Sequence, residues 1–270
     1  MVGNNSEVNI STRPASVGDL LRYWRGQRGF SQLDLALEGS TSQRHLSFVE
    51  SGRSVPSRTM LVALSKALNI PLRERNALLL VAGYAPLYTE ASIDDATMKV
   101  VTNVIDQMLS NHEPHPALLM DRYWNVVRTN SAASAFFGSM IDLSAFPKPR
   151  NLLELTFDPA GLRPHIEDWE TVAAGLIERV RREALGLVID DRLQALLDKL
   201  RRYPGAERLP VSTNPESPIL PITFRRGVER ISYFSLVTTI GTPQTVTAQE
   251  LRLECMFPIA PPAETIRSGA

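Results

Sequence analysis

The sequence contains almost no cysteine, no long hydrophobic run and no excess of charge of either sign. Cys255 is the only cysteine, so an intramolecular disulfide and a C-x-x-C zinc site are both excluded, and a reducing compartment is favoured. No apolar run approaches the roughly 18 residues that span a bilayer, and residues 1–13 are polar. The 29 basic and 29 acidic side chains cancel. We therefore expect a cytoplasmic protein without a membrane anchor or a secretory signal.

Motifs of catalysis are missing as well. The sequence has no G-x-S-x-G nucleophile elbow, no P-loop and no G-x-G-x-x-G fingerprint. His112, Glu113 and His115 lie close together, but Pro114 prevents the helical i, i+4 geometry of a zinc protease. Cys255 lies in an apolar strand pattern with no histidine nearby in sequence, which favours a buried, inert thiol. We expect no enzyme activity, no cofactor and no metal site.

The length and the composition are those of a globular protein. The 270 residues suffice for two domains, each with its own core. Hydrophobic residues make up 43% of the chain and charged residues 21%, which is typical of folded proteins. Residues 1–90 carry ten basic and seven acidic side chains, whereas residues 91–270 carry nineteen and twenty-two. This small asymmetry allows a polyanionic partner for the first part of the chain.

Helical periodicity predicts an all-helical domain over residues 16–86, after a flexible N-terminus at 1–15. Cap residues and glycines divide the pattern into five short helices, at residues 17–29, 31–38, 42–52, 57–68 and 73–82. Ser31 and Asp34 form a capping-box pattern, and residues 39–41 form a turn. Residues 87–113 are predicted to be a connecting segment that becomes helical from about Asp94.

Residues 114–262 combine strand and helix patterns. Strands are predicted at residues 117–120, 124–129, 219–226, 230–240 and 250–258, and helices at 130–138, 169–184 and 192–203. Gly227 fits a hairpin between the third and fourth strands. This order predicts a mostly antiparallel sheet with helices packed on it, followed by a tail at 263–270. The fold class is therefore α+β.

The strongest local signal is a helix-turn-helix pattern over residues 31–58. Ala36 allows a close approach of the two helices, while Leu46 and Val49 face inward, so that Arg44 and Phe48 point outward. Arginine and glutamine near the start of such a helix can each make two hydrogen bonds to a base edge. Gln32 and Arg53 are placed to contact phosphate. The predicted DNA-binding residues are Gln32, Ser42, Gln43, Arg44, His45, Ser47, Arg53 and Ser57.

Residues 32–36, 45–53 and 56–57 resemble the Xre-type, lambda-repressor-like family of DNA-binding domains. Residues 71–80 and 82–86 look like one branch of it, the MmyB-like transcription regulators. In one respect the sequence departs from the family, which usually has glycine where Ser40 stands; here the glycine is Gly39. The turn can therefore bend differently, and a non-glycine residue in the left-handed conformation would cost about 1 kcal/mol.

The second half is similar to the MmyB-like ligand-binding domain, which has a PAS-like architecture. The matching motifs are at residues 116–127, 130–133, 151–153, 157–159, 162–165, 168–169 and 251–258. Together with the helical domain, the resemblance covers about residues 17–260. It implies a sensor pocket for a small apolar molecule such as a fatty acid.

Aromatic residues of the second half are candidates for that pocket, although aromatic residues at such spacing also form plain core. Arg163 or His165 could pair with the head group of a carboxylate ligand, because a charge that enters an apolar cavity needs a partner. The predicted ligand-binding residues are Trp124, Phe137, Phe157, Arg163, His165 and Trp169.

We therefore expect a ligand-responsive transcription regulator that binds a roughly palindromic operator as a homodimer, with half-sites about one helical turn (~34 Å) apart. Three alternatives stay open. The helical domain could be an ordinary subdomain with a solvated polar face. It could be an antitoxin-like protein-interaction module, because Phe48 is an aromatic residue on the otherwise polar outward face of the third helix. The chain could also be an enzyme of PAS-like fold whose turnover survives removal of residues 1–90.

Overall fold

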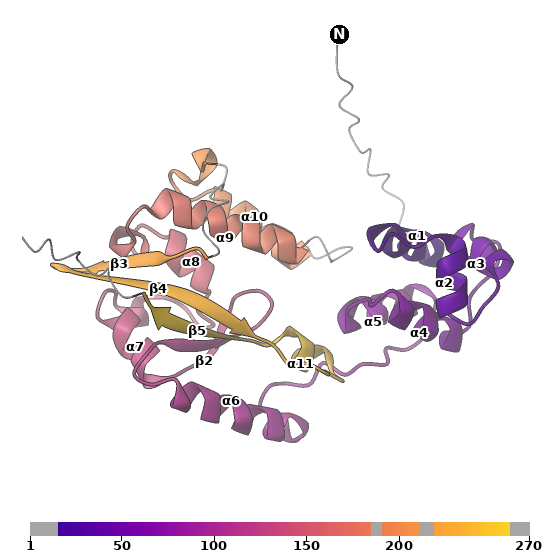
Figure 1. The fold of residues 1–270 in the computed structure, drawn as a ribbon, viewed down its shortest axis with the longest axis horizontal. Coiled ribbons are helices and arrows are strands. Elements are labelled where there is room, and N and C mark those ends of the chain that lie inside the picture. Colours follow the sequence, from indigo (N-terminus) through magenta and orange to yellow (C-terminus); the bar gives the residue numbers. More distant parts are fainter. Residues whose placement is uncertain (1–15, 185–190, 211–218, 260–270) are drawn as a thin grey trace, which may run out of the picture. The chain divides into compact units, whose positions relative to one another are not determined.

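The computed structural model describes residues 16–184, 191–210 and 219–259. The chain divides into two compact units, Met1–Tyr88 and Thr89–Ala270 (Figure 1). The predicted N-terminal segment 1–15 and the tail 263–270 lie outside the described residues. Among the helices that the structure describes, none is long and apolar enough to cross a membrane.

The first unit consists of short helices whose starts are set by serines. The helices are α1 (Val17–Gln27), α2 (Gln32–Glu38), α3 (Gln43–Glu50), α4 (Arg58–Ala67) and α5 (Leu72–Val81). Ser16, Ser31, Ser42 and Ser57 are the N-caps of the first four, and each hydroxyl oxygen accepts a hydrogen bond from the backbone N–H three residues on. Helix α5 begins after Pro71 without a side-chain cap. The prediction of an all-helical N-terminal region is confirmed.

The turn between α2 and α3 places its left-handed residue at Ser40. Ser40 has a φ of 52°, whereas Gly39 has a φ of −83° and lies in contact with α4. A Cβ at position 39 would lie 2.5 Å from Leu64 Cδ2 and 3.0 Å from the Leu35 carbonyl oxygen. Glycine is therefore needed at position 39 for close packing. Ser40, not the glycine, adopts the unfavourable left-handed backbone conformation.

The second unit contains a sheet of five strands, β1 (Ala117–Met120), β2 (Val126–Thr129), β3 (Ile222–Arg226), β4 (Glu229–Thr238) and β5 (Arg252–Pro258). The strand order is β2-β1-β5-β4-β3, and every neighbouring pair is antiparallel. The antiparallel sheet and the α+β class are confirmed. Trp124, predicted to begin the second strand, has a φ of 66° and belongs to the turn before β2. There the Asp121 carboxylate accepts hydrogen bonds from the backbone N–H groups of Tyr123 and Asn125, which delays the strand.

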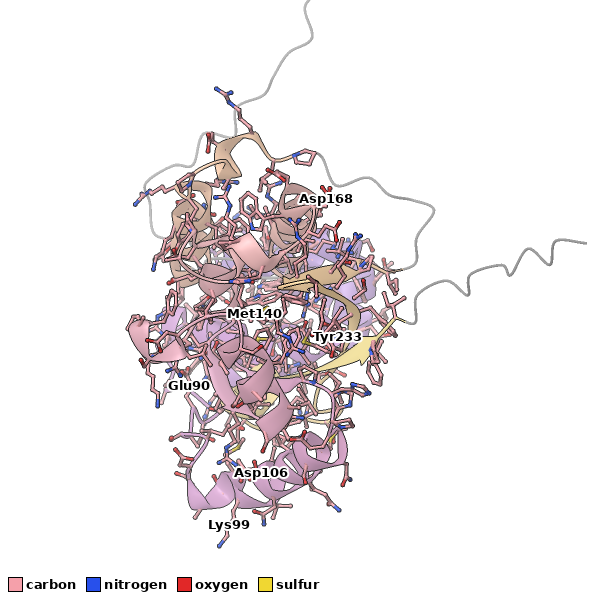
Figure 2. The ribbon with its side chains drawn as sticks, turned by 90° about the vertical axis from the view of Figure 1, so that its left-hand side faces the viewer. Glu90, Lys99, Asp106, Met140, Asp168 and Tyr233 are labelled. Carbon is pink, nitrogen blue, oxygen red and sulfur yellow. The ribbon has the colours of Figure 1, made fainter. Side chains whose placement is uncertain are left out.

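Helices cover both faces of this sheet (Figure 1). They are α6 (Lys99–Asn111), α7 (Ser131–Gly138), α8 (Leu152–Phe157), α9 (Trp169–Ala184), α10 (Asp191–Arg201) and α11 (Val246–Glu250). Short 3-10 turns are η1 (Ala96–Met98), η2 (Leu143–Ala145), η3 (Arg163–His165) and η4 (Ala206–Arg208). In Figure 2, Asp106 of α6 and Asp168 before α9 lie towards opposite ends of the view, with Tyr233 of β4 between them.

Alternate residues of β1 enter two different cores. Leu118 and Met120 pack into the cluster that includes side chains of α7 to α10, whereas Ala117 and Leu119 pack against α6 and α11. A strand that is buried on both faces reads as a continuous apolar run, which explains why residues 117–120 show no polar alternation. The helix of the segment expected to connect the domains, α6, is thus part of the second unit.

Candidate functional site

Helices α2 and α3 form a pair joined by residues 39–42. Ala36 of α2 and Leu46 and Val49 of α3 are each no more than 1% exposed, so these residues fix the inner face of the pair. Ser42 caps α3 by accepting a hydrogen bond from the His45 N–H at 3.1 Å. The inner face of α3 is therefore anchored in the core, and its opposite face is left for other contacts.

The outward face of α3 is accessible to solvent. Gln43, Arg44 and His45 are exposed, while Ser47 and Phe48 are half-buried. The guanidinium carbon of Arg44 lies 5.5 Å from the centroid of the Phe48 ring, which places the charge over the ring. Phe48 thus supports the arginine of the preceding turn, and this face of α3 presents polar and cationic groups.

Three arginines give this region a positive charge. Arg44 on α3, Arg53 after α3 and Arg58 at the start of α4 are all exposed. Within the described part of the chain, none of the three takes part in an ion pair. Their charge is therefore available to a polyanion, as phosphate contacts require.

A buried carboxylate holds the first three helices together. Glu50, at the end of α3, is 3% exposed, and its carboxylate accepts hydrogen bonds from Arg25 Nε at 2.7 Å and Arg25 Nη2 at 3.0 Å. The Gln32 side-chain amide donates to the same carboxylate at 2.9 Å, and Arg22 donates to the Glu50 carbonyl oxygen. This network fixes the orientation of α3 relative to α1 and α2.

The protonation of Glu50 follows from these contacts. Burial by itself raises the pKa of Glu50. The hydrogen bonds from Arg25 and Gln32 and the charges of Arg25 and Arg22 lower the pKa by more than burial raises it, so that the pKa of Glu50 lies below its ordinary value. The same hydrogen bond with Glu50 raises the pKa of Arg25 against the effect of burial. The pair is therefore charged at neutral pH.

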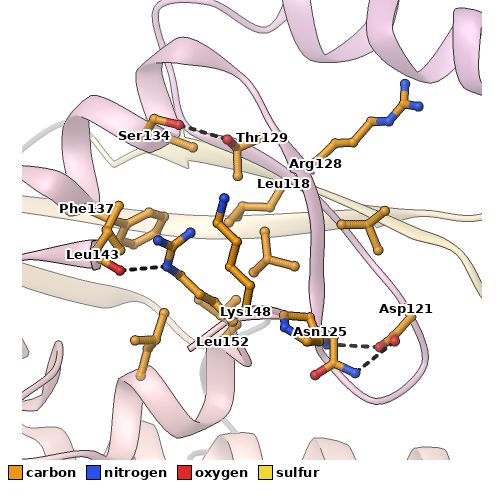
Figure 3. Close-up of a pocket in the computed structure, with 16 residues that line it drawn as sticks. Leu118, Asp121, Asn125, Arg128, Thr129, Ser134, Phe137, Leu143, Lys148 and Leu152 are labelled. Carbon is orange, nitrogen blue, oxygen red and sulfur yellow. Dashed lines mark hydrogen bonds between the residues drawn. The ribbon is translucent and has the colours of Figure 1, made fainter. Parts of the chain in front are cut away.

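The second unit contains a pocket of about 630 Å³ between the edge strand β2, helix α7 and the segment that leads into α8 (Figure 3). Its volume lies in the range of small-molecule sites. It is lined by Leu118, Asp121, Asn125, Val126, Val127, Arg128, Thr129, Ala133, Ser134, Phe137, Leu143, Lys148, Pro149, Arg150, Leu152 and Leu155. The walls are mainly apolar, with charged side chains among them.

Two family models match the chain. The model of the MmyB-like transcription regulator ligand binding domain matches residues 101–268, and a helix-turn-helix model matches residues 21–75. The chain belongs to the MmyB-like regulator family. It is a DNA-binding transcription regulator with a ligand-binding domain. No curated protein matches the sequence. In the described parts of this MmyB-like regulator, no group of three histidine, cysteine, aspartate or glutamate side chains could hold a metal ion.

Most of the predicted ligand-binding residues do not line this pocket of the MmyB-like domain. Phe137 does. Trp124, Phe157 and Trp169 are 2%, 0% and 5% exposed and belong to the main core cluster. Their indole or phenyl rings pack against other side chains, as in the edge-on contact of Phe157 with Trp169 at 5.5 Å.

The two predicted head-group residues do not line this pocket either. The guanidinium carbon of Arg163 lies 3.7 Å from the centroid of a Trp169 ring, and Arg163 also donates to the Pro204 carbonyl oxygen. His165 Nδ1 lies 3.4 Å from the Arg225 carbonyl oxygen. The structure brings Arg163, Trp169 and Phe157 together, but as packing partners.

Two cations of the pocket and one exposed arginine of the helical unit of this MmyB-like regulator are not among the residues predicted from the sequence. Lys148 and Arg150 flank Pro149, between the helices predicted at 130–138 and 169–184, where the sequence predicted no helix or strand. The two basic side chains next to a proline were the only signal in the sequence that could have pointed to these cations. Arg58 directly follows the predicted Ser57 and could have been found from that neighbour.

Proposed function

We propose that this protein reads a specific operator sequence through α3 and that a small ligand of the second unit controls this binding. The observation that carries the proposal is the exposed polar and cationic face of α3, with Gln43 and Arg44 in its first turn. A helix that enters the major groove contacts base edges with residues near its N-terminus. Arginine and glutamine can each discriminate a base by two hydrogen bonds, worth about 1 to 3 kcal/mol.

The remaining predicted residues are proposed to position this helix. His45 and Ser47 lie beside the reading face, and Ser42 and Ser57 each accept a backbone N–H with the hydroxyl oxygen. A hydroxyl that accepts one bond keeps its proton for a phosphate oxygen. Gln32 and Arg53 are proposed as phosphate contacts, with the amide of Gln32 held by Glu50.

We propose a homodimer, since two copies related by two-fold symmetry read a palindrome whose half-sites are about one helical turn (~34 Å) apart. The proposed effector is a small apolar or fatty-acid-like molecule in the MmyB-like domain. It can control DNA binding only if it binds two states of the protein unequally. The mainly apolar walls of the pocket beside β2 support this class of effector.

The test compares two arginines of the helical unit. After the operator has been selected from random duplexes, binding is measured for the full chain over a series of salt concentrations. Arg44→Ala should lose about 1 to 3 kcal/mol at the selected site and relax base preference there. Arg53→Ala should weaken all duplexes alike and reduce the salt slope by about one.

Arg208→Ala is the matched control, because it removes an exposed arginine from the second unit. It should change neither the affinity nor the base preference. Unchanged affinity and preference in Arg44→Ala would show that α3 is not the reading helix. If the affinity for the operator does not fall as the salt concentration rises, the protein-interaction module is favoured instead.

A further inference from the structure

Phe48 is an aromatic residue on the outward face of α3, where the other outward side chains are polar. The core residues of this helix, Leu46 and Val49, are each no more than 1% exposed, whereas Phe48 is half-buried. Packing inside the helical unit therefore leaves part of the ring in contact with water, which is unfavourable for an apolar group. A partner that covers this part of the ring with another apolar group would gain affinity.

The ring and the guanidinium of Arg44 form one pair on the surface of α3. The two residues are four positions apart, so they lie on the same face of the helix, about 5.4 Å apart along its axis. The guanidinium carbon is 5.5 Å from the centroid of the ring. This contact orients the guanidinium without using its N–H groups, all of which remain donors. The pair thus presents a fork of hydrogen-bond donors beside an apolar ring.

The major groove of DNA offers groups that are complementary to both parts of this pair. The guanidinium matches the two acceptors of guanine, O6 and N7. The apolar group on the major-groove edge of a base is the C5-methyl group of thymine, which 5-methylcytosine also carries. Successive base pairs are 3.4 Å apart, so a separation of about 5.4 Å along the helix corresponds to one or two base pairs.

We infer that Phe48 contacts the C5-methyl group of a pyrimidine that lies one or two base pairs from the guanine bound by Arg44. The inference rests on the proposed function, because it takes α3 as the helix that contacts the operator. It gives the aromatic ring on this face a role in DNA recognition. The competing explanation, a protein partner that covers the ring, becomes an outcome of the test.

The experiment replaces thymine by deoxyuridine, one position at a time, in the operator selected for the full chain. Deoxyuridine pairs with adenine as thymine does and lacks only the methyl group. At one thymine of each half-site, the wild-type protein should bind about fourfold more weakly, as expected for one methyl group that is no longer removed from water. In Phe48→Ala the same replacement should leave the affinity unchanged.

The position that responds is then tested as cytosine and as 5-methylcytosine, each paired with guanine. If the 5-methylcytosine duplex binds more tightly than the thymine duplex, 5-methylcytosine is the base that Phe48 contacts. If it does not, the base is thymine. These duplexes therefore distinguish the two sources of the methyl group.

Tyr23→Ala is the matched control, because it removes another aromatic ring of the helical unit, 38% exposed on α1. This variant should keep the fourfold effect of the methyl group. Amide hydrogen exchange checks that Phe48→Ala is folded, and the comparison of thymine with deoxyuridine on the wild-type protein needs no variant.

Two results would overturn the inference. The first is an operator in which no thymine and no 5-methylcytosine responds to loss of its methyl group. The second is a methyl effect that persists in Phe48→Ala, which would assign the contact to another residue. If Phe48→Ala also binds every duplex as the wild-type protein does, a protein partner for the ring is favoured. Arg44→Ala still reports on the proposed function in each case, because its loss of base preference does not depend on the methyl group.

Discussion

The two units differ in how far apart in sequence their functional parts lie. In the helical unit, a single eight-residue helix, α3, carries the exposed face proposed to contact DNA, and Ser42, the residue before it, marks its start. In the second unit, the pocket gathers residues from Leu118 to Leu155, and its sheet pairs Leu118 with Glu254. Local sequence therefore determines the exposed face of α3, whereas the pocket forms only after residues far apart in sequence have paired.

The same contrast applies to what the aromatic residues do. In the helical unit, Phe48 and Arg44 are one helical turn apart, so their contact follows from helix geometry alone. In the second unit, Phe137 lines the pocket while Phe157 lies fully inside the core. Three perturbations would sharpen or break this comparison.

The largest expected effect is on the second unit. Phe157→Ala removes a ring that is 0% exposed and packs against Trp169 and Tyr203. The free energy of unfolding of this unit should fall by about 3 to 5 kcal/mol, since truncation leaves a cavity in the core. Amide hydrogen exchange on the full chain, read by mass spectrometry, reports the two units separately.

Lys148→Ala serves as the control for this loss, because an exposed side chain should change stability by no more than about 0.5 kcal/mol. The comparison would fail if Phe157→Ala kept its stability and lost the ligand control of DNA binding. In that case the ring predicted from the sequence would belong to the ligand site after all.

The sequence predicted the fold of both units better than it predicted the pocket. Serine caps and helical periodicity gave the helix starts, and β-rich segments gave the strands of the antiparallel sheet. Spacing alone, however, does not distinguish a ring that lines a cavity from one that fills the core, as with Phe137 and Trp169. Nor can it show that Lys148 and Leu118 line the same pocket, because the 29 residues between them must first fold.

A smaller effect is expected in the helical unit at Glu50. Glu50→Gln leaves Arg25 charged and half-buried without its carboxylate, and the loss of one partner of a buried ion pair costs about 3 kcal/mol. Protection of the α1 and α3 amides against exchange should fall accordingly. Glu38→Gln, on the exposed surface of α2, should leave this protection unchanged. A loss confined to the second unit would contradict the assignment of Glu50 to the packing of the helices.

The contribution of Glu50 should also depend on pH. Because its folded-state pKa is depressed, the stability that it contributes is fully present above the unfolded-state pKa of about 4.3 and is lost as the pH falls through the folded-state pKa. The helical unit should therefore lose protection in acid, below about pH 4. In Glu50→Gln this part of the pH dependence should be absent.

The smallest effect concerns the turn before α3, where two neighbouring positions give opposite predictions. Ser40→Gly should raise the free energy of unfolding by up to about 1 kcal/mol, because glycine adopts a φ of 52° without the steric cost that serine has. The gain is limited, since glycine also gives the unfolded chain more conformational freedom. Gly39→Ala should lower stability by about 1 to 3 kcal/mol, because the added Cβ would lie 2.5 Å from Leu64 Cδ2. Thermal unfolding of both variants measures the difference. If the two variants change stability in the same direction, the left-handed residue of the turn is not Ser40, and the contact of the turn with α4 must be rearranged.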